Sequence, residues 1–420
     1  MPRLAGGLLM LGFAAAALPA AAQSAPVDPL VLTHANVVDV RTGRVTADAT
    51  LVLRGGRIES IGATPAPSGV RTLDLKGKYV LPGLIDAHTH ADNFAAFQRA
   101  LESGVTTMRS AGVSNYADVC FHELVQKGAA IGPDIVPAGY HVRPRLAPEA
   151  FLNNPEYSDL MSGVTTIEKL RRAVDMNLAH GVKWIKILAT DRAGTADTDP
   201  RKQLYTEDEI RAIVQEAATK GVPVEAHAHG DEGAMAAVKA GVRSIEHGTY
   251  LSDATLRLMK EKGTYFDPTY TAVIDIAEPG GEYDVPALII RGQHMLPRAQ
   301  QTVRRAHQFG VKIVAGGDTG YGPNSLTRIG QEMTHLVELG LTPIEAIQAG
   351  TITNAEMLRM EKSIGLVEPG YEADLIVVEG NPLENIVTVQ DPLLVISNGR
   401  VGVDRLNFGR AASSMPSRPD

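Results

Sequence analysis

Pairs of histidines stand two residues apart at the ends of two apolar segments of this chain. His88 and His90 end one segment, and His227 and His229 end the other. In a β-strand, residues two apart lie on the same face, about 6.5–7 Å from each other. Two imidazoles at that spacing can bind one metal ion from the end of a strand. The spacing therefore predicts a metal site, provided that the fold brings further ligands to it.

Other side chains that can bind metal follow further apolar segments. Lys186, His247 and Asp318 each stand at or near the end of one. Lys183 and Lys186 have opposite parity in an extended segment, so only one can point inward, and Lys186 is nearer the end. A protonated lysine is a poor ligand, but its carbamate with CO₂ carries two oxygens and a negative charge and can bridge two divalent ions. The alternative is a lysine at the rim of the fold, with its stem on apolar surface and its charge in solvent.

His227, His229 and Asp318 admit more than one role. The two histidines share a face with Glu225, and we expect the deeper His227 to bind metal and His229 to face the substrate. Asp318 follows two glycines that allow close backbone approach, so its carboxylate can bind metal and also move a proton. An ordinary hydrogen-bonded histidine is the alternative for His141 and His229. For Asp318 the alternative is a cap of the next loop or helix.

These residues need a fold that gathers the ends of several strands. From Gly83 onward, strand-like segments alternate with helical ones, and the clearest helix, 206–220, begins with a capping box of Thr206 and Glu209. We count eight strands, at 84–90, 105–109, 134–140, 183–189, 222–228, 243–247, 264–267 and 311–317. This pattern predicts an α/β fold, a (β/α)8 TIM barrel, whose active sites lie at the C-terminal ends of the strands. A doubly wound open sheet is the alternative, which the lack of a GxGxxG motif after a strand disfavours.

Short strands separated by turns occupy the regions before and after this pattern. The turn spacing in 23–82 predicts antiparallel pairing, and strand-like runs return in 366–409. We expect these two regions to form one small β-sandwich domain, into which the barrel, 83–365, is inserted. Residues 410–420 are predicted to be a disordered tail.

The first 22 residues have the features of a cleaved signal peptide. Arg3 precedes an apolar stretch at 8–18, and three alanines at 20–22 supply a cleavage site. The apolar stretch is too short for a transmembrane helix, and we expect no membrane partner. Export to the periplasm or secretion is therefore predicted, with a disordered alanine-rich tail as the alternative.

Composition argues against several kinds of site. The net charge of −8 and the aromatic content of 5% give no basis for binding nucleic acid. Cys120 is the only cysteine, so the chain can form neither an intrachain disulfide nor a cysteine-based metal site.

The motifs together resemble those of the metal-dependent amidohydrolase superfamily, in its binuclear form with a carboxylated lysine. The matching segments, in the family's order, are PGLIDAHTH, Lys186, VEAHAHG, IEHG, AGGDTG, TPIEAIQAGTITNAEML and IGLVEPGYEADLIVVEGNPL. They are most similar to the branch that holds imidazolonepropionase-like proteins, Xaa-Pro dipeptidases and ochratoxin-hydrolysing amidohydrolases, and most of all to bacterial proteins of the last kind. The resemblance implies two divalent ions, with zinc expected, and a homo-oligomer, with an octamer as one form.

By position in these motifs, the resemblance also implies a role for each site residue. His88 and His90 hold the more buried ion, His227 and His247 hold the second, and Lys186 bridges them as N6-carboxylysine. Asp318 is both a ligand and the catalytic proton carrier, and His229 assists catalysis at the substrate carbonyl. Loops after the strands are expected to bind the substrate, with Ser110, Tyr140, His141, Arg143, Arg145 and Tyr270 as candidates. For Arg145 a solvated surface position is the alternative.

The reaction that the resemblance implies is metal-dependent hydrolysis of an amide bond by a metal-bridging hydroxide. The expected substrates are small N-acyl amino acids or dipeptides, including ochratoxin A, which gives ochratoxin alpha and phenylalanine. An Xaa-Pro dipeptidase and a cyclic-amide or lactone hydrolase are alternatives on the same metal site. A periplasmic binding protein or metal-storage scaffold is the alternative from another class, and storage does not need a carboxylate that carries protons.

Overall fold

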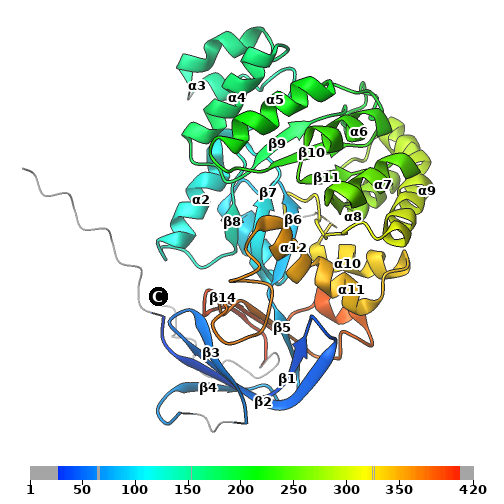
Figure 1. The fold of residues 1–420 in the computed structure, drawn as a ribbon. Coiled ribbons are helices and arrows are strands. Elements are labelled where there is room, and N and C mark those ends of the chain that lie inside the picture. The colour runs from blue at the N-terminus through cyan, green and yellow to red at the C-terminus, as the bar shows by residue number, and fades with distance from the viewer. Residues whose placement is uncertain (1–26, 64–66, 153, 324, 326, 407–420) are drawn as a thin grey trace, which may run out of the picture.

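The computed structural model describes residues 27–63, 67–152, 154–323, 325 and 327–406. The predicted signal peptide, 1–22, and the predicted tail, 410–420, lie outside these residues. Figure 1 shows a sheet built from both ends of the described chain, below a larger region of alternating strands and helices.

One mixed sheet of eight strands joins the two ends of the chain. Its order is β15-β14-β13-β5-β1-β2-β3, with β4 beside β1. The strands are β1 (Leu30–Asp39), β2 (Arg44–Arg54), β3 (Arg57–Gly62), β4 (Arg71–Asp74), β5 (Tyr79–Pro82), β13 (Leu375–Val378), β14 (Leu394–Ser397) and β15 (Arg400–Asp404). Strand β5 pairs with β1 from the N-terminal part and with β13 from the C-terminal part. A separate apolar core of leucines, valines and alanines lies against this sheet. The sandwich arrangement and the limits 23–82 and 366–409 stay predictions.

Two parallel sheets form the centre of the larger region. The first has β6 (Leu84–Thr89), β7 (Val105–Ser110) and β8 (Asp134–Val136), and the second has β9 (Ile185–Leu188), β10 (Val224–Ala228), β11 (Ser244–His247) and β12 (Tyr265–Asp267). Nearly all their residues are buried, which explains why these strands form apolar runs in the sequence. They correspond, in order, to the first seven predicted strands. The result is a mixed α/β fold consistent with a TIM barrel.

Two predicted strands differ from the structure. The strand predicted at 134–140 ends at Val136, because the next residue is a proline, which has no N–H to donate to a neighbouring strand. The strand predicted at 311–317 is not a regular strand and has an isolated bridge, from Ile313 to Phe266. The end of this segment is held by a side chain instead, because the Gly317 N–H donates to Asp86 Oδ1 at 2.9 Å.

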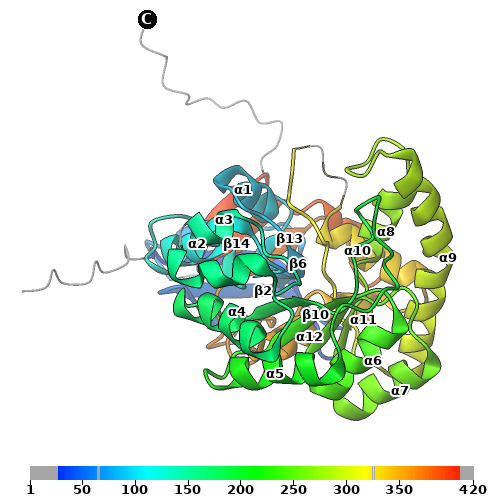
Figure 2. The same ribbon diagram turned by 90° about the horizontal axis from the view of Figure 1, so that it is seen from above.

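Helices follow most of the parallel strands and lie outside them (Figure 2). They are α1 (Phe94–Glu102), α2 (Ala117–Gln126), α3 (Glu149–Leu152), α4 (Ile167–Ala179), α5 (Glu207–Ala218), α6 (Asp231–Ala240), α7 (Asp253–Lys262), α8 (Tyr270–Ala277), α9 (Pro286–Phe309), α10 (Ile329–Glu338), α11 (Pro343–Ala349) and α12 (Ile352–Leu358). The predicted capping box of Thr206 and Glu209 is present at the start of α5. Within the described ranges, no helix combines the length and the apolar character needed to cross a membrane.

Gly83 marks the passage from the mixed sheet to the parallel strands. Its N–H donates to the carbonyl of Asp374 at 2.8 Å, which ties the start of β6 to β13. A Cβ atom at Gly83 would lie 2.0 Å from Oγ1 and 2.7 Å from Cβ of Thr106, inside van der Waals contact. Only glycine fits here without moving strand β7.

We expect Gly83→Ala to lower the free energy of unfolding by about 1–3 kcal/mol, the usual cost of overpacking a filled core. Gly132→Ala is the matched control, because the nearest atom to its added Cβ is 3.8 Å away. Chemical denaturation of both variants measures the difference. Equal stability of the two variants would contradict the tight contact with Thr106.

Candidate metal centre

The predicted ligands converge on one open cavity at the C-terminal ends of the parallel strands. Strands β6, β9, β10 and β11 supply most of its polar side chains, and Asp318 reaches it from the segment after β12. The residues that the sequence assigned to metal or catalysis all line it: His88, His90, Lys186, His227, His229, His247 and Asp318.

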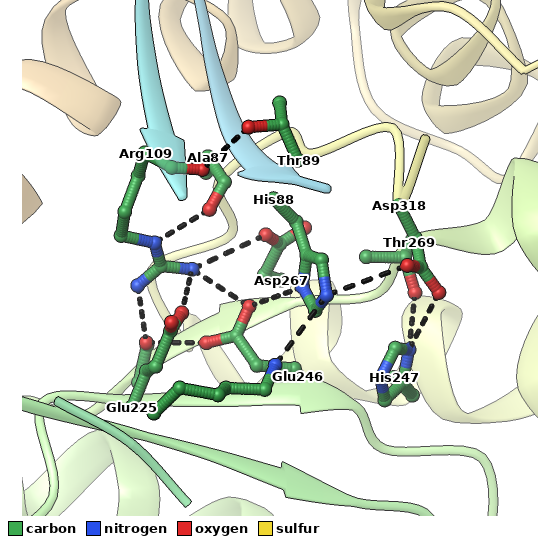
Figure 3. Close-up of polar contacts among 12 residues, drawn as sticks. Ala87, His88, Thr89, Arg109, Glu225, Glu246, His247, Asp267, Thr269 and Asp318 are labelled. Carbon is green, nitrogen blue, oxygen red and sulfur yellow. Dashed lines mark hydrogen bonds and ion pairs between the residues drawn. The ribbon is translucent and has the colours of Figure 1, made fainter. Parts of the chain in front are cut away.

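His88, His90 and Asp318 form one group of possible ligand atoms in this cavity. One such atom from each residue lies within 4.8 Å of the others. Asp318 Oδ1 is 3.5 Å from His88 Nε2 and 3.2 Å from His90 Nε2. Figure 3 shows His88 between Asp318 on one side and a buried carboxylate, Glu246, on the other. Two imidazoles and one carboxylate suit a divalent ion such as zinc.

His227, His229 and His247 form the second group, again with one atom from each within 4.8 Å of the others. The ring centroid of His247 is 4.4 Å from that of His227 and 4.7 Å from that of His229. The two groups adjoin, because the ring centroids of His88 and His247 are 5.1 Å apart. His229 thus lies where it can contact a substrate and also where a third imidazole ligand would lie.

One ring nitrogen of each of these five histidines is held by the protein. The pairs are His88 Nδ1 with Glu246 Oε2 at 3.0 Å, His90 Nδ1 with Gly112 O at 2.8 Å, His227 Nε2 with Asp191 O at 3.0 Å, His229 Nδ1 with Thr249 Oγ1 at 2.8 Å, and His247 Nδ1 with Thr269 Oγ1 at 2.7 Å. The two backbone carbonyls can only accept, so His90 and His227 donate and keep the opposite nitrogen unprotonated. An unprotonated nitrogen of fixed direction is what a metal ion needs from imidazole.

The ionisation of these groups also suits metal binding. Burial holds the pKa of His88, His227 and His247 well below the ordinary histidine value and lowers the pKa of His229 to about 3. Burial alone would raise the pKa of Asp318, but His88 and His90 beside it hold that pKa below the usual carboxyl range. The site therefore presents neutral imidazoles and an ionised carboxylate, the forms that bind divalent ions.

Lys186 is buried in the same cavity, with its Nζ 3.4 Å from His88 Nε2. Among the described residues, no carboxylate lies close enough to its Nζ to form an ion pair. Carboxylation would replace the positive charge by two metal-binding oxygens.

The segment that carries Asp318 is fixed by a buried carboxylate, Asp86. Asp86 Oδ1 accepts the N–H groups of Gly317 at 2.9 Å and His88 at 3.1 Å, and Oδ2 accepts the hydroxyl of Tyr321 at 2.6 Å. Asp318 has φ +45°, in the left-handed region that non-glycine residues rarely adopt. Such strain persists only where neighbours fix the backbone, so Asp86 positions both His88 and Asp318.

Comparison with known proteins agrees with this site. The sequence model of the amidohydrolase family matches residues 79–402. The chain belongs to the amidohydrolase family. The resemblance inferred from the motifs is thereby confirmed, and the protein is a hydrolase that acts on carbon–nitrogen bonds.

Several relatives of this amidohydrolase have named activities. Ochratoxinase of Aspergillus niger is 29% identical over 356 residues, which cover 75% of this chain and 73% of that protein. Imidazolonepropionase of Vibrio vulnificus is 25% identical over 383 residues, covering 83% and 91% of the two chains. The crystal structure of a Xaa-Pro dipeptidase with bound methionine in the active site is similar with a TM-score of 0.80 and 29% identity, covering 89% and 99%. The crystal structure of A. niger ochratoxinase is similar with a TM-score of 0.74 and 25% identity, covering 90% and 96%.

The candidate substrate residues of the amidohydrolase occupy different places. His141 lines the metal cavity, and Tyr140, His141 and Arg143 line an adjoining cavity that shares His90 with it. Ser110 and Tyr270 are buried and absent from the lining of both cavities. The Ser110 hydroxyl accepts the N–H of Gly112, and the Tyr270 hydroxyl accepts from Gln300. Arg145 is exposed and lines neither cavity.

Sequence reasoning missed several residues that shape the amidohydrolase cavity. Arg192 lines both cavities, and Tyr283 closes part of the metal cavity beside a wall of apolar residues from α8. Arg192 follows β9 in the chain, so the rule that function lies after strand ends could have found it. No comparable pattern marks Tyr283, which lies between two helices in the sequence.

We expect Tyr321→Phe to lower the free energy of unfolding by about 1–3 kcal/mol and to reduce kcat, because Asp86 loses a buried partner and the Asp318 segment loosens. Tyr371→Phe is the control, since its hydroxyl donates to the carbonyl of Glu361 far from the ligands. Denaturation and steady-state kinetics measure both effects. An unchanged kcat in Tyr321→Phe would show that Asp86 holds Asp318 without this bond.

Proposed function

We propose that this amidohydrolase hydrolyses the amide bond of small N-acyl amino acids and dipeptides, ochratoxin A among them, releasing ochratoxin alpha and phenylalanine. The observation that carries the proposal is the pair of adjoining ligand groups, each within 4.8 Å, at the bottom of one open cavity. The similarity to ochratoxinase and to Xaa-Pro dipeptidase supports the substrate class.

The ligand sets suit two zinc ions. His88 and His90 belong to one ion and His227 and His247 to the other, with Asp318 as a further ligand. Lys186, as N6-carboxylysine, would join the two sets. The supporting observations are the fixed imidazoles and the buried Lys186 amine, whose Nζ is 3.4 Å from His88 Nε2.

A closed (β/α)8 barrel accounts for the convergence of these ligands. Residues 311–317 take the eighth position in it, supported by hydrogen bonds from Phe266 N to Lys312 O at 2.9 Å and from Ala87 N to Ala315 O at 3.1 Å. On the other side, Val142 N donates to Lys186 O at 2.8 Å, which joins the two parallel sheets.

Two of the chain's own residues, Asp318 and His229, would act in the reaction beside the bound ions. Bound divalent ions supply Lewis acidity, which lowers the pKa of water and polarises a carbonyl. Asp318 is ionised and beside both ligand groups, so it can take the proton of the attacking water and give it to the departing amine. His229 is placed to contact the substrate carbonyl, and its hydrogen bond with Thr249 sets the direction of the ring.

The walls of the cavity differ in a way that suits an acyl amino acid. Arg192 and Arg143 lie on one side and form no ion pair with any described carboxylate, so a substrate carboxylate can bind there. Apolar residues lie on the other side and suit an aromatic or aliphatic acyl group: Leu188, Ala272, Val273, Ile276 and Tyr283. Ochratoxin A carries both features.

An Xaa-Pro dipeptidase is the second candidate, favoured by the structural similarity at a TM-score of 0.80. A substrate panel separates the possibilities: ochratoxin A, N-acyl amino acids, Xaa-Pro dipeptides, and a cyclic amide and a lactone as further alternatives. Each is assayed with the protein as purified and after treatment with a chelator. Activity that is indifferent to the chelator, or confined to the lactone, would refute the proposal.

We also propose that the chain is exported to the periplasm or secreted, and that it assembles as a homo-oligomer without nucleic-acid or membrane partners. Cell fractionation tests the first statement. Light scattering of the mature chain tests the second, and a monomer at all concentrations would contradict it.

Asp318→Asn should lower kcat by about 100- to 10,000-fold, because the amide cannot carry the proton. The substitution is isosteric, so folding should persist and circular dichroism serves as the check. Rates on the best substrate of the panel provide the measurement. A fully active variant would remove Asp318 from proton transfer.

Arg192→Met should raise KM for N-acyl amino acids by about 10- to 100-fold, the worth of a charge-assisted pair, and leave KM for their methyl esters nearly unchanged. Arg145→Met is the control, because this arginine lies outside both cavities. Equal effects on acid and ester would contradict recognition of a carboxylate by Arg192.

A further inference from the structure

Arg109 is wholly buried and lies to one side of His88, with Asp318 and His247 on the other side (Figure 3). It extends from β7 toward carboxylates on three other parallel strands. Its Nη2 is 2.8 Å from Glu225 Oε2, 2.7 Å from Glu246 Oε2 and 3.7 Å from Asp267 Oδ2. Each of these carboxylates is also wholly buried. One guanidinium therefore faces three acidic side chains in a region that excludes water.

The guanidinium has no freedom to turn. Its Nε donates to the carbonyl of Ala87 at 2.5 Å, and its Nη1 donates to the hydroxyl of Ser244 at 2.9 Å. Its central carbon lies 5.1 Å from the ring centroid of Trp184, which is buried as well. The plane of Arg109 and the direction of Nη2 are thus fixed by contacts on several sides.

Glu246 connects the fixed Arg109 guanidinium to His88, a predicted metal ligand. Its Oε2 accepts from Arg109 Nη2 and, at 3.0 Å, from His88 Nδ1. Its Oε1 accepts the hydroxyl of Ser244. Both carboxylate oxygens are occupied, so the group cannot rotate away from His88. The opposite nitrogen, His88 Nε2, lies 3.4 Å from Lys186 Nζ and 3.5 Å from Asp318 Oδ1.

We propose that Arg109 and Glu246 form a positioning pair for His88. The pair keeps the proton on Nδ1 and turns Nε2 toward the more buried ion, and this inference rests on the proposed function. Neither residue lines the cavity. Glu225 and Asp267 contact the same guanidinium from β10 and β12.

The chemistry of imidazole explains why such a pair is needed. A neutral histidine can carry its proton on either nitrogen, and only the unprotonated one binds metal. Without an acceptor at Nδ1, His88 can take the other tautomer or turn its ring. Loss of a carboxylate that orients a metal-binding histidine commonly weakens metal affinity about 10- to 100-fold.

The test measures metal affinity rather than activity. Wild-type protein and the variants Glu246→Gln, Arg109→Met and Ser244→Ala are loaded with zinc, and the release of each ion to a chromogenic chelator is followed. We expect Glu246→Gln and Arg109→Met to lower the affinity for one of the two zinc ions about 10- to 100-fold. Ser244→Ala should lower this affinity less. The double variant of Arg109 and Glu246 should lose no more zinc affinity than the more affected single variant, because the two residues act as one unit.

Glu332→Gln is the matched control for removing a buried charge. Glu332 is also wholly buried, but it accepts the N–H groups of Tyr270 and Thr271 and contacts no predicted ligand. A purely structural role of Arg109 and Glu246 would lower the melting temperature of the metal-free protein, as Glu332→Gln should, and leave zinc affinity unchanged.

The outcomes separate the inference from the proposed function. Wild-type protein that binds no zinc refutes the proposed function and the inference together. Wild-type protein that binds two ions while Glu246→Gln and Ser244→Ala release them at the wild-type rate overturns the positioning pair alone. Should Arg109→Met fail to fold, the other two variants still decide the question, since they preserve the guanidinium.

Discussion

The site depends on hydrogen bonds that fix one ring nitrogen in each of five histidines, His88, His90, His227, His229 and His247. Within each group, one ligand atom of every residue lies within 4.8 Å of the others. These atoms can bind one metal ion only if the unprotonated nitrogens point toward the same place. The partners that set these directions come from the layer behind the ligands: a carboxylate for His88, carbonyls for His90 and His227, and hydroxyls for His229 and His247. The histidines alone would not define the site.

The fold provides that second layer because parallel strands place neighbouring residues in register. Lys186 pairs with Glu225, and His227 with Glu246, across β9, β10 and β11. Side chains from the strand ends form the cavity, and those one step below them form the buried cluster around Arg109. The loop at Asp318 joins both layers through Asp86. The buried charge of Arg109 is tolerated because its guanidinium contacts Glu225 and Glu246 and donates to Ala87 and Ser244.

Much of this arrangement could be predicted from the sequence, because alternating strand and helix patterns and the spacing of His88 and His90 are local features. The order of seven parallel strands and the sheet shared by both chain ends were predicted for that reason. The pairing of Arg109 with Glu246 could not be, since it depends on side chains from different strands meeting inside the fold. The irregular 311–317 segment was also missed, because an apolar run does not reveal that this segment forms an isolated bridge with β12 instead of a regular strand.

Metal stoichiometry tests the central claim most directly. Metal-free protein is titrated with zinc while bound metal per chain and amide hydrolysis are followed together. The account predicts that binding saturates at two ions per chain and that hydrolysis reaches its maximum at the same point. Saturation at one ion, or full hydrolysis by the metal-free protein, would contradict it.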